Sequence, residues 1–256
     1  MHDKRRETIK ETIKKMFSIT EDTASHDEIK DRLISGGKVT GTNMCVMICA
    51  MIIASVGLNK NSTAVIIGAM LISPLMGSIL VIAYGVESAD SYIVRRHLIG
   101  LVFQIVVSVL TSTIYFYISP IKETTPELLA RTDPSAYDII IALAGGIAGI
   151  IGQTRKDKSN NIIPGAAIST AIMPPLCTCG YSIANKRWHM LAGASYLFLV
   201  NAYFIFLGSA MILGVLKIPK VREITEKEWK RLKIRMFRNT IIIALPSILI
   251  GLSMSK

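Results

Sequence analysis

Apolar runs about as long as a membrane-spanning helix recur along the chain and constrain its fold more than any other feature. A helix that crosses the hydrocarbon core of a bilayer needs roughly 20 mostly apolar residues. Hydrophobic residues make up 51% of the chain, and polar segments separate the apolar runs. The sequence predicts an all-α polytopic bundle with about seven spans, near residues 42–58, 63–86, 98–119, 137–152, 162–185, 190–216 and 240–254. The last run is short, so six spans plus a re-entrant or surface helix is the alternative.

The polar segments divide the chain into four predicted regions. Near the N-terminus, apolar residues recur at helical spacing among charged ones, which predicts amphipathic helices on the membrane surface or on the protein's own cytoplasmic face. The first region is a cytoplasmic amphipathic segment (1–41), and the second is a six-span core (42–216) made of the halves 42–119 and 137–216. A basic cytoplasmic segment (217–239) follows, and the last region is a short span with its tail (240–256).

The positive charge of the chain predicts its orientation. Cytoplasmic loops of membrane proteins carry an excess of Lys and Arg. If the N-terminus is cytoplasmic, 23 of the 29 Lys and Arg residues fall on the cytoplasmic side. We therefore predict a multi-pass protein of the cell (plasma) membrane, surrounded by the lipid bilayer, with a cytoplasmic N-terminus. This excess of Lys and Arg on the cytoplasmic side explains the net charge of +11. The sequence contains no aromatic-interleaved basic patch or helix-turn-helix pattern, so we predict no nucleic-acid partner.

The run from Ile162 to Tyr181 is apolar enough to enter a bilayer, yet it contains Pro164, Pro174 and Pro175. A proline inside a helix removes a backbone donor and clashes with the carbonyl four residues earlier. In a membrane such a break is tolerated where the backbone lines a cavity or is buried against protein. The run is therefore a candidate site, and a kinked helix packed among its neighbours is the alternative.

A second proline-containing run, residues 63–86, occupies the corresponding place in the first group of three spans. Aligning Pro74 with Pro175 places Gly68–Leu75 over Ser169–Leu176, and both segments are apolar and contain small residues. Each run is the middle member of three spans, and the two run in opposite directions. Paired interrupted segments in inverted halves indicate the binding site of a secondary transporter. We predict two inverted three-helix repeats with broken spans two and five, against the alternative of a chance similarity.

We predict a ligand-binding site near the bilayer midplane, where the two broken spans meet. Helix N-termini freed by the breaks could hold an anionic group, and freed carbonyls could hold a cation. Polar residues of spans three and six could face this site or form hydrogen bonds between helices. The predicted ligand-binding residues are Ser73, Pro74, Gln104, Ser169, Thr170, Pro174, Pro175 and Asn201.

Several classes of chemistry find no support in the sequence. No charged residue lies at the centre of any predicted span, which argues against a built-in proton relay. The motifs of phosphate-binding loops, zinc proteases and serine hydrolases are absent, so we predict neither an enzyme nor a catalytic residue. The four cysteines lie in apolar runs, which favours small buried residues over disulfides or a metal site. We predict no metal and no cofactor. The four cysteines are Cys45, Cys49, Cys177 and Cys179.

The leading functional hypothesis is a transporter or channel for a small solute or ion. One alternative is a non-transporting membrane scaffold or sensor that acts through its basic cytoplasmic segments. The other is a membrane protein that binds a nucleotide or a lipid headgroup at the broken-helix N-termini. The small residues Gly145, Gly146 and Gly149 predict tight helix contacts, either within one subunit or in a homo-oligomer.

Three blocks of the chain, Gly68–Gly77, Thr125–Pro134 and Pro164–Leu176, resemble the signature segments of one family. In this order, over roughly residues 42–216, they are similar to the prokaryotic membrane family called domain of unknown function 389. The resemblance implies a membrane fold and a prokaryotic membrane location. It implies neither a reaction nor a substrate.

Overall fold

The fold is built from helices, most of them long and apolar. The computed structural model describes residues 22–156, 162–223 and 225–254, and within these ranges it contains no strand. The side chains of residues 162–171, 229, 233 and 247–254 lie outside the description. The helices are α2 (His26–Gly36), α3 (Gly41–Asn59), α4 (Thr63–Ile72), α5 (Leu75–Glu87), α6 (Ser91–Ile118), α7 (Pro126–Leu129), α8 (Ala136–Thr154), α9 (Ile162–Ala184), α10 (Trp188–Val215) and α11 (Glu226–Met254).

Four of these helices, α3, α6, α8 and α10, are long and apolar enough to cross a membrane. The pair α4–α5 passes the same test as one span, bent by 51° at a short break. The described residues therefore contain four or five candidate spans, which confirms an all-helical membrane protein. The total of about seven spans stays a prediction.

The predicted and observed ends of the core helices agree within a few residues, except at the start of α6. The sequence places the start of the third span near Leu98, whereas α6 begins seven residues earlier. The Asp90 side chain caps the helix there, because it accepts hydrogen bonds from the backbone N–H groups of Tyr92 and Ile93 at 3.0 and 3.1 Å. Arg95 therefore lies inside the helix rather than in a loop.

Glycine permits the closest contact between α8 and α10. A Cβ atom added to Gly146 would lie 2.3 Å from the carbonyl oxygen of Ile205, so only glycine fits there. The Ser209 hydroxyl also donates a hydrogen bond to the Gly146 carbonyl oxygen at 3.1 Å. This contact confirms the tight helix packing predicted from the glycines of the fourth span.

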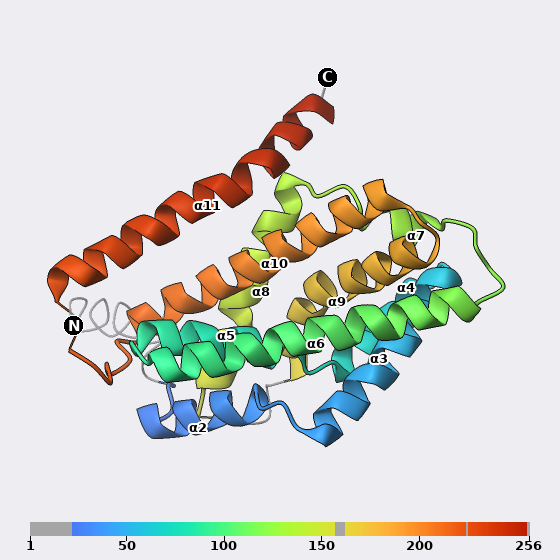
Figure 1. The fold of residues 1–256 in the computed structure, drawn as a ribbon. Coiled ribbons are helices and arrows are strands. Elements are labelled where there is room, and N and C mark those ends of the chain that lie inside the picture. The colour runs from blue at the N-terminus through green and yellow to red at the C-terminus, as the bar shows by residue number, and fades with distance from the viewer. Residues whose placement is uncertain (1–21, 157–161, 224, 255–256) are drawn as a thin grey trace, which may run out of the picture.

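The middle helices of the two predicted halves exchange partners. Helix α9 packs on α10 and on α6, and α5 packs on α6 and on α10; Figure 1 shows these four helices together. At the α9–α6 contact, a Cβ atom on Gly180 would lie 2.5 Å from the Cβ of Ser112. The Ser112 hydroxyl donates to the carbonyl oxygen of Cys177 at 2.9 Å. The helices thus form one bundle rather than two separate triplets.

The predicted break in the fifth span is wrong. Helix α9 is one continuous helix from Ile162 to Ala184, with Pro174 and Pro175 inside it. Every residue from Ile172 to Ser182 is buried, and α9 contacts α3, α4, α6, α8 and α10. Packing on all sides holds the helix together despite the backbone donors that the prolines lack. The alternative of a packed proline-containing helix is the correct one.

The chain ends in one long helix at the edge of the bundle. Helix α11 joins the predicted basic segment and the predicted last span in a single element. It lies beside α10 (Figure 1), where the hydroxyl groups of Tyr203 and Tyr196 donate to the carbonyl oxygens of Met236 and Ile243 at 2.8 and 2.7 Å. The charged first half and the apolar second half of α11 therefore belong to one helix.

Candidate functional site

The break between α4 and α5 follows from Ser73 and Pro74. The residue before a proline is pushed away from helical backbone angles, and Ser73 is extended, with φ −76° and ψ 128°. Proline itself suits the start of a helix, because the N–H group that it lacks would have no partner there. Pro74 makes no side-chain hydrogen bond to cap α5. The N–H groups of the first turn of α5 therefore receive no acceptor from the capping residue.

A cavity of about 180 Å³ opens at this break. Because one water molecule occupies about 30 Å³ of liquid, the cavity can hold a small solute or a few waters. Residues of α2, α4, α5 and α8 enclose it, so the cavity connects the break with α2 and with the end of α8. The lining residues are Arg32, Leu33, Gly36, Leu71, Ser73, Pro74, Met76, Gly77, Leu80 and Gln153.

Two polar atoms beside this cavity are buried without a partner. The Ser73 hydroxyl oxygen and the Arg32 Nε form no hydrogen bond within the described part of the chain. Leaving a buried polar atom unpaired costs about 1–3 kcal/mol. Both atoms can donate a hydrogen bond, as can the first N–H groups of α5. The break is therefore rich in donors, and this suits a bound oxygen acceptor or a small anion.

The rest of the Arg32 guanidinium is fixed by its neighbours. Its terminal nitrogens donate to the carboxylate of Glu28 and to the carbonyl oxygens of Arg155 and Lys156, and its side chain is only 12% exposed. The carbonyl contacts lie just beyond the end of α8. Arg32 thus holds a defined position between α2, α8 and the break.

Gly77 allows the end of α2 to reach the break. A Cβ atom on Gly77 would lie 2.1 Å from the carbonyl oxygen of Gly36, whereas a Cβ on Gly36 would meet nothing within 4 Å. The segment before α2 is also tied to α8, because the backbone N–H of Ala24 donates to the carbonyl oxygen of Thr154 at 2.8 Å. The start of α5 is therefore shaped to receive α2, which places Arg32 beside Ser73.

The structure places the predicted site residues in three groups. Ser73 and Pro74 line the cavity, which residues of α2, α4, α5 and α8 enclose. Gln104 is 1% exposed and accepts a hydrogen bond from the Ser78 hydroxyl at 2.9 Å, so it joins α6 to α5. Asn201 is buried in α10 and is not among the residues that line the cavity. For Gln104 the alternative of an interhelical hydrogen bond is therefore the observed one.

The residues predicted from the fifth span stand apart from the cavity. Pro174 and Pro175 are buried in α9 and do not line it. The side chains of Ser169 and Thr170 lie outside the described residues. Helix α9 nevertheless contacts both α4 and α5, so the two proline-containing segments do meet. Thr178 adds a buried hydroxyl oxygen that has no hydrogen-bond partner within the described residues.

Sequence reasoning missed Arg32 as a site residue. The sequence predicts amphipathic helices for the charged N-terminal region, on the membrane surface or on the protein's own cytoplasmic face, and gives Arg32 no role in the site. The buried residues of α2 are the apolar stripe of Ile29 and Leu33. Both residues are fully buried or nearly so, and α2 packs on α5 and α8. An arginine that directly precedes a buried leucine of such a stripe is the signal that marks Arg32.

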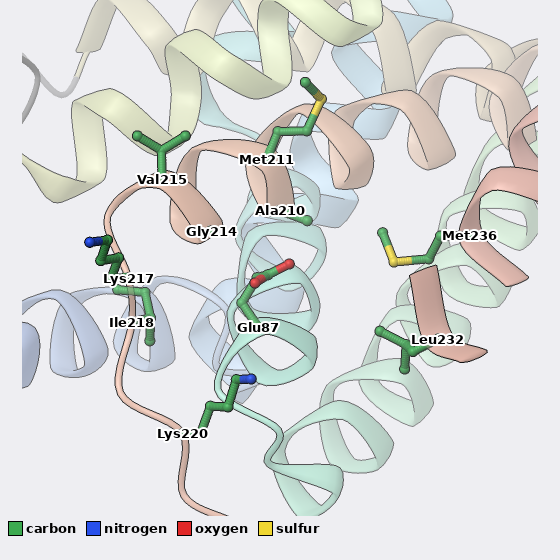
Figure 2. Close-up of a pocket in the computed structure, with 10 residues that line it drawn as sticks. All are labelled: Glu87, Ala210, Met211, Gly214, Val215, Lys217, Ile218, Lys220, Leu232 and Met236. Atoms are coloured by element: carbon green, nitrogen blue, oxygen red, sulfur yellow. The ribbon is translucent and has the colours of Figure 1, made fainter. Parts of the chain in front are cut away.

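A larger cavity of about 580 Å³ lies where α5, α10 and α11 meet. Figure 2 shows the Glu87 carboxylate at the end of α5 directed into this space, with Leu232 and Met236 of α11 facing it. Gly214 of α10 lies directly beside the carboxylate, because a Cβ there would be in van der Waals contact with a Glu87 carboxylate oxygen, at 3.5 Å. Glu87 therefore lines a cavity at the end of the predicted second span.

Metal-binding clusters and disulfides are absent from the described residues. No group of three or more His, Cys, Asp or Glu residues is arranged there to hold a metal ion. All four cysteines are free thiols. Cys177 and Cys179 are buried, as expected, but Cys45 and Cys49 are exposed on α3. The expectation that all four are buried is wrong, because the face of α3 that carries this pair has no protein neighbour within the described chain.

Comparisons with known proteins agree with the helical membrane core. The model of a family described as "Domain of unknown function (DUF389)" matches residues 70–207. "Uncharacterized protein MJ0678" of Methanocaldococcus jannaschii is 28% identical over 195 residues, which are 76% of this chain and 59% of that protein. The chain therefore matches less than two thirds of the length of this relative. No solved structure is significantly similar to the chain. The family match begins just before the α4–α5 break and ends within α10.

Proposed function

We propose that this chain, which belongs to the family described as domain of unknown function DUF389, is a transporter or channel for a small solute or ion that contacts the α4–α5 break. One observation carries the proposal. The break opens a cavity beside the buried hydroxyl of Ser73 and the Nε of Arg32, and neither atom has a hydrogen-bond partner in the described structure. Irregular backbone at membrane depth is typical of sites that line a cavity.

The lengths and contacts of the core helices support two related halves. Helices α3 and α8 each have 19 residues, and α6 and α10 each have 28. In each proposed half a proline-containing segment separates the shorter helix from the longer one. The exchange of α5 and α9 between the long helices is the packing that a two-fold relation produces. These features favour the inverted-repeat design of secondary transporters, in which the site lies where the repeats meet.

The donors at the break favour an anionic or oxygen-rich solute. Arg32 carries a positive charge, and the N-terminus of α5 adds a partial positive charge. Glu28 pairs with Arg32 and offsets part of this field. A site whose positive charge is partly offset by a carboxylate suits transport, because a transported solute must bind and also leave.

Thermal unfolding of the purified protein in detergent tests the binding step. The probes are chloride, nitrate, phosphate, acetate, glycine and glucose, each added at 10 mM. A ligand that binds only the folded protein raises the unfolding midpoint by mass action. We expect an anion to raise it, and Ser73→Ala or Arg32→Gln to abolish the shift. Ser62→Ala is the matched control, since Ser62 lies at the opposite end of α4 and its side chain makes no capping hydrogen bond.

Uptake into proteoliposomes then tests transport. We expect the stabilising probe to enter vesicles that contain the protein faster than empty vesicles, and Ser73→Ala to reduce that rate. Binding without uptake would instead favour a sensor that recognises the ligand. If none of the probes binds and none is taken up, the proposal is overturned and the scaffold hypothesis is favoured. A pull-down with residues 217–238 as bait tests that hypothesis.

A further inference from the structure

Four arginines surround a second cavity of about 580 Å³, next to the one in Figure 2. It lies between the α5–α6 turn and the first half of α11. Arg95 comes from α6, Arg222 from the loop after α10, and Arg231 and Arg235 from successive turns of α11. The arginines thus reach one space from three separate parts of the chain. This arrangement depends on tertiary packing and could not be seen in the sequence.

The positive charge of this cleft is largely uncompensated. Glu228 is the one carboxylate among its lining residues. It lies 4.0 Å from Arg222 and accepts a hydrogen bond from the Thr225 hydroxyl at 3.3 Å. Arg95, Arg231 and Arg235 form no salt bridge with any described residue. Guanidinium groups bind phosphate through paired N–H donors, so a phosphate is the group that best suits a cleft lined by these three arginines.

The same cleft has an apolar wall. Its remaining lining residues include Val86 of α5, Val94 and Leu98 of α6, and Leu232 of α11. Leu232 also lines the neighbouring cavity, where Met211 and Val215 continue the apolar surface along α10. A free phosphate would use only the arginines, whereas a phospholipid would also cover the apolar wall with its glycerol and the beginning of its acyl chains.

Both helices that form the cleft change from charged to apolar at this level. Arg95 and Arg96 lie in the second turn of α6, and no further Lys, Arg, Asp or Glu follows in that candidate span. Helix α11 likewise carries its charges up to Arg238 and is apolar beyond Thr240. Such a boundary is where lipid headgroups meet a membrane protein, and basic pockets between helices at this depth bind anionic headgroups.

We propose that this cleft is a binding site for an anionic phospholipid, whose phosphate contacts Arg95, Arg231 and Arg235 and whose acyl chains lie against Leu98 and Leu232. The lipid links α11, which the bundle holds by few contacts, to α6. The site is separate from the α4–α5 break, so the inference does not depend on the proposed transport function. It requires only that the protein lies in a membrane.

Lipid titration of the purified full-length protein in a neutral detergent tests the site. Phosphatidylglycerol is the probe, phosphatidylcholine is the neutral lipid control, and inorganic phosphate is the soluble control. We expect phosphatidylglycerol alone to raise the unfolding midpoint at micromolar concentration. The double variant R231Q/R235Q should weaken the apparent affinity about thirtyfold and R95Q about fivefold, because each cation near a lipid surface contributes a similar increment.

A matched double variant controls for overall charge. K227Q/K230Q removes two positive charges from the same exposed first half of α11, and neither lysine lines the cleft. We expect this variant to keep the wild-type affinity and all variants to keep the lipid-free unfolding midpoint. Equal stabilisation by phosphatidylcholine, or equal loss in both double variants, would overturn the proposal. Stabilisation by inorganic phosphate with the same arginine dependence would also overturn it and would indicate a soluble-anion site.

Discussion

Two proline-containing segments of this protein have opposite structures. The α4–α5 segment is broken at Ser73 and Pro74 and bends by 51°. Helix α9 contains two adjacent prolines and remains continuous. Leu71 and Ile72, directly before the break, are 50% and 46% exposed, whereas α9 is buried on every side from Ile172 to Ser182. The environment of a proline, rather than the number of prolines, decides whether a helix breaks here.

The largest expected effect comes from disturbing the packing that surrounds α9. Gly180→Leu would place a large side chain against Ser112, where even a Cβ lies at 2.5 Å. We expect a loss of about 3 kcal/mol or more of unfolding free energy, because overpacking of a close helix contact cannot relax locally. Gly68→Leu in α4 is the control, since its Cβ meets nothing within 4 Å. Thermal unfolding in detergent measures both, and equal midpoints would contradict the role given to packing.

A smaller effect is expected where α2 meets the broken segment. Gly77→Ala would bring a Cβ to 2.1 Å from the Gly36 carbonyl oxygen, and we expect it to cost about 2 kcal/mol. It should also move Arg32 and expose α2 to limited proteolysis. Gly36→Ala adds the same methyl group in open space and should be cut no faster than wild type. Rapid cleavage of both variants would mean that α2 is not held by this contact.

A hydroxyl group that contacts α9 and one at the α4–α5 break should differ in their contribution to stability. The Ser112 hydroxyl lies 3.0 Å from the Ser55 hydroxyl and donates to α9, so Ser112→Ala should cost about 1 kcal/mol. Ser73→Ala removes a hydroxyl that has no partner among the described residues, and its unfolding midpoint should stay at or slightly above that of wild type. Chemical denaturation compares the two. A clear destabilisation by Ser73→Ala would show that this hydroxyl is structural.

The prolines themselves should respond with opposite signs. Pro74 starts α5 with φ −83°, which suits proline, so Pro74→Ala should lower stability by about 0.5–1 kcal/mol through the freer unfolded chain. Pro174 lies inside a helix, where proline removes a hydrogen bond, so Pro174→Ala should raise stability by a similar amount, about 0.5–1 kcal/mol. Equilibrium denaturation measures both values. Two changes of the same sign would remove the distinction between the segments.

The comparison also shows what could be predicted from the sequence. The spans follow from the length of the apolar runs, and the break at Pro74 follows from local backbone sterics, so both were predictable. The continuity of α9 depends on the contacts around residues 172–182, which no local pattern encodes. Arg32 reaches the break only because Gly77 admits the end of α2. These features arise from pairs of residues far apart in the chain, and the site was therefore only half predicted.

The exchange of α5 and α9 between the two long helices has a consequence for biosynthesis. Helix α5 emerges from the ribosome long before α10, and α6 long before α9, yet each pair is in contact in the finished bundle. The early helices must therefore enter the bilayer with half of their mature neighbours still unmade. Contacts so distant along the chain form slowly. The contacts of α5 with α10 can therefore form only after α10 has been synthesised, whereas the contacts of α5 with α6 can form before it.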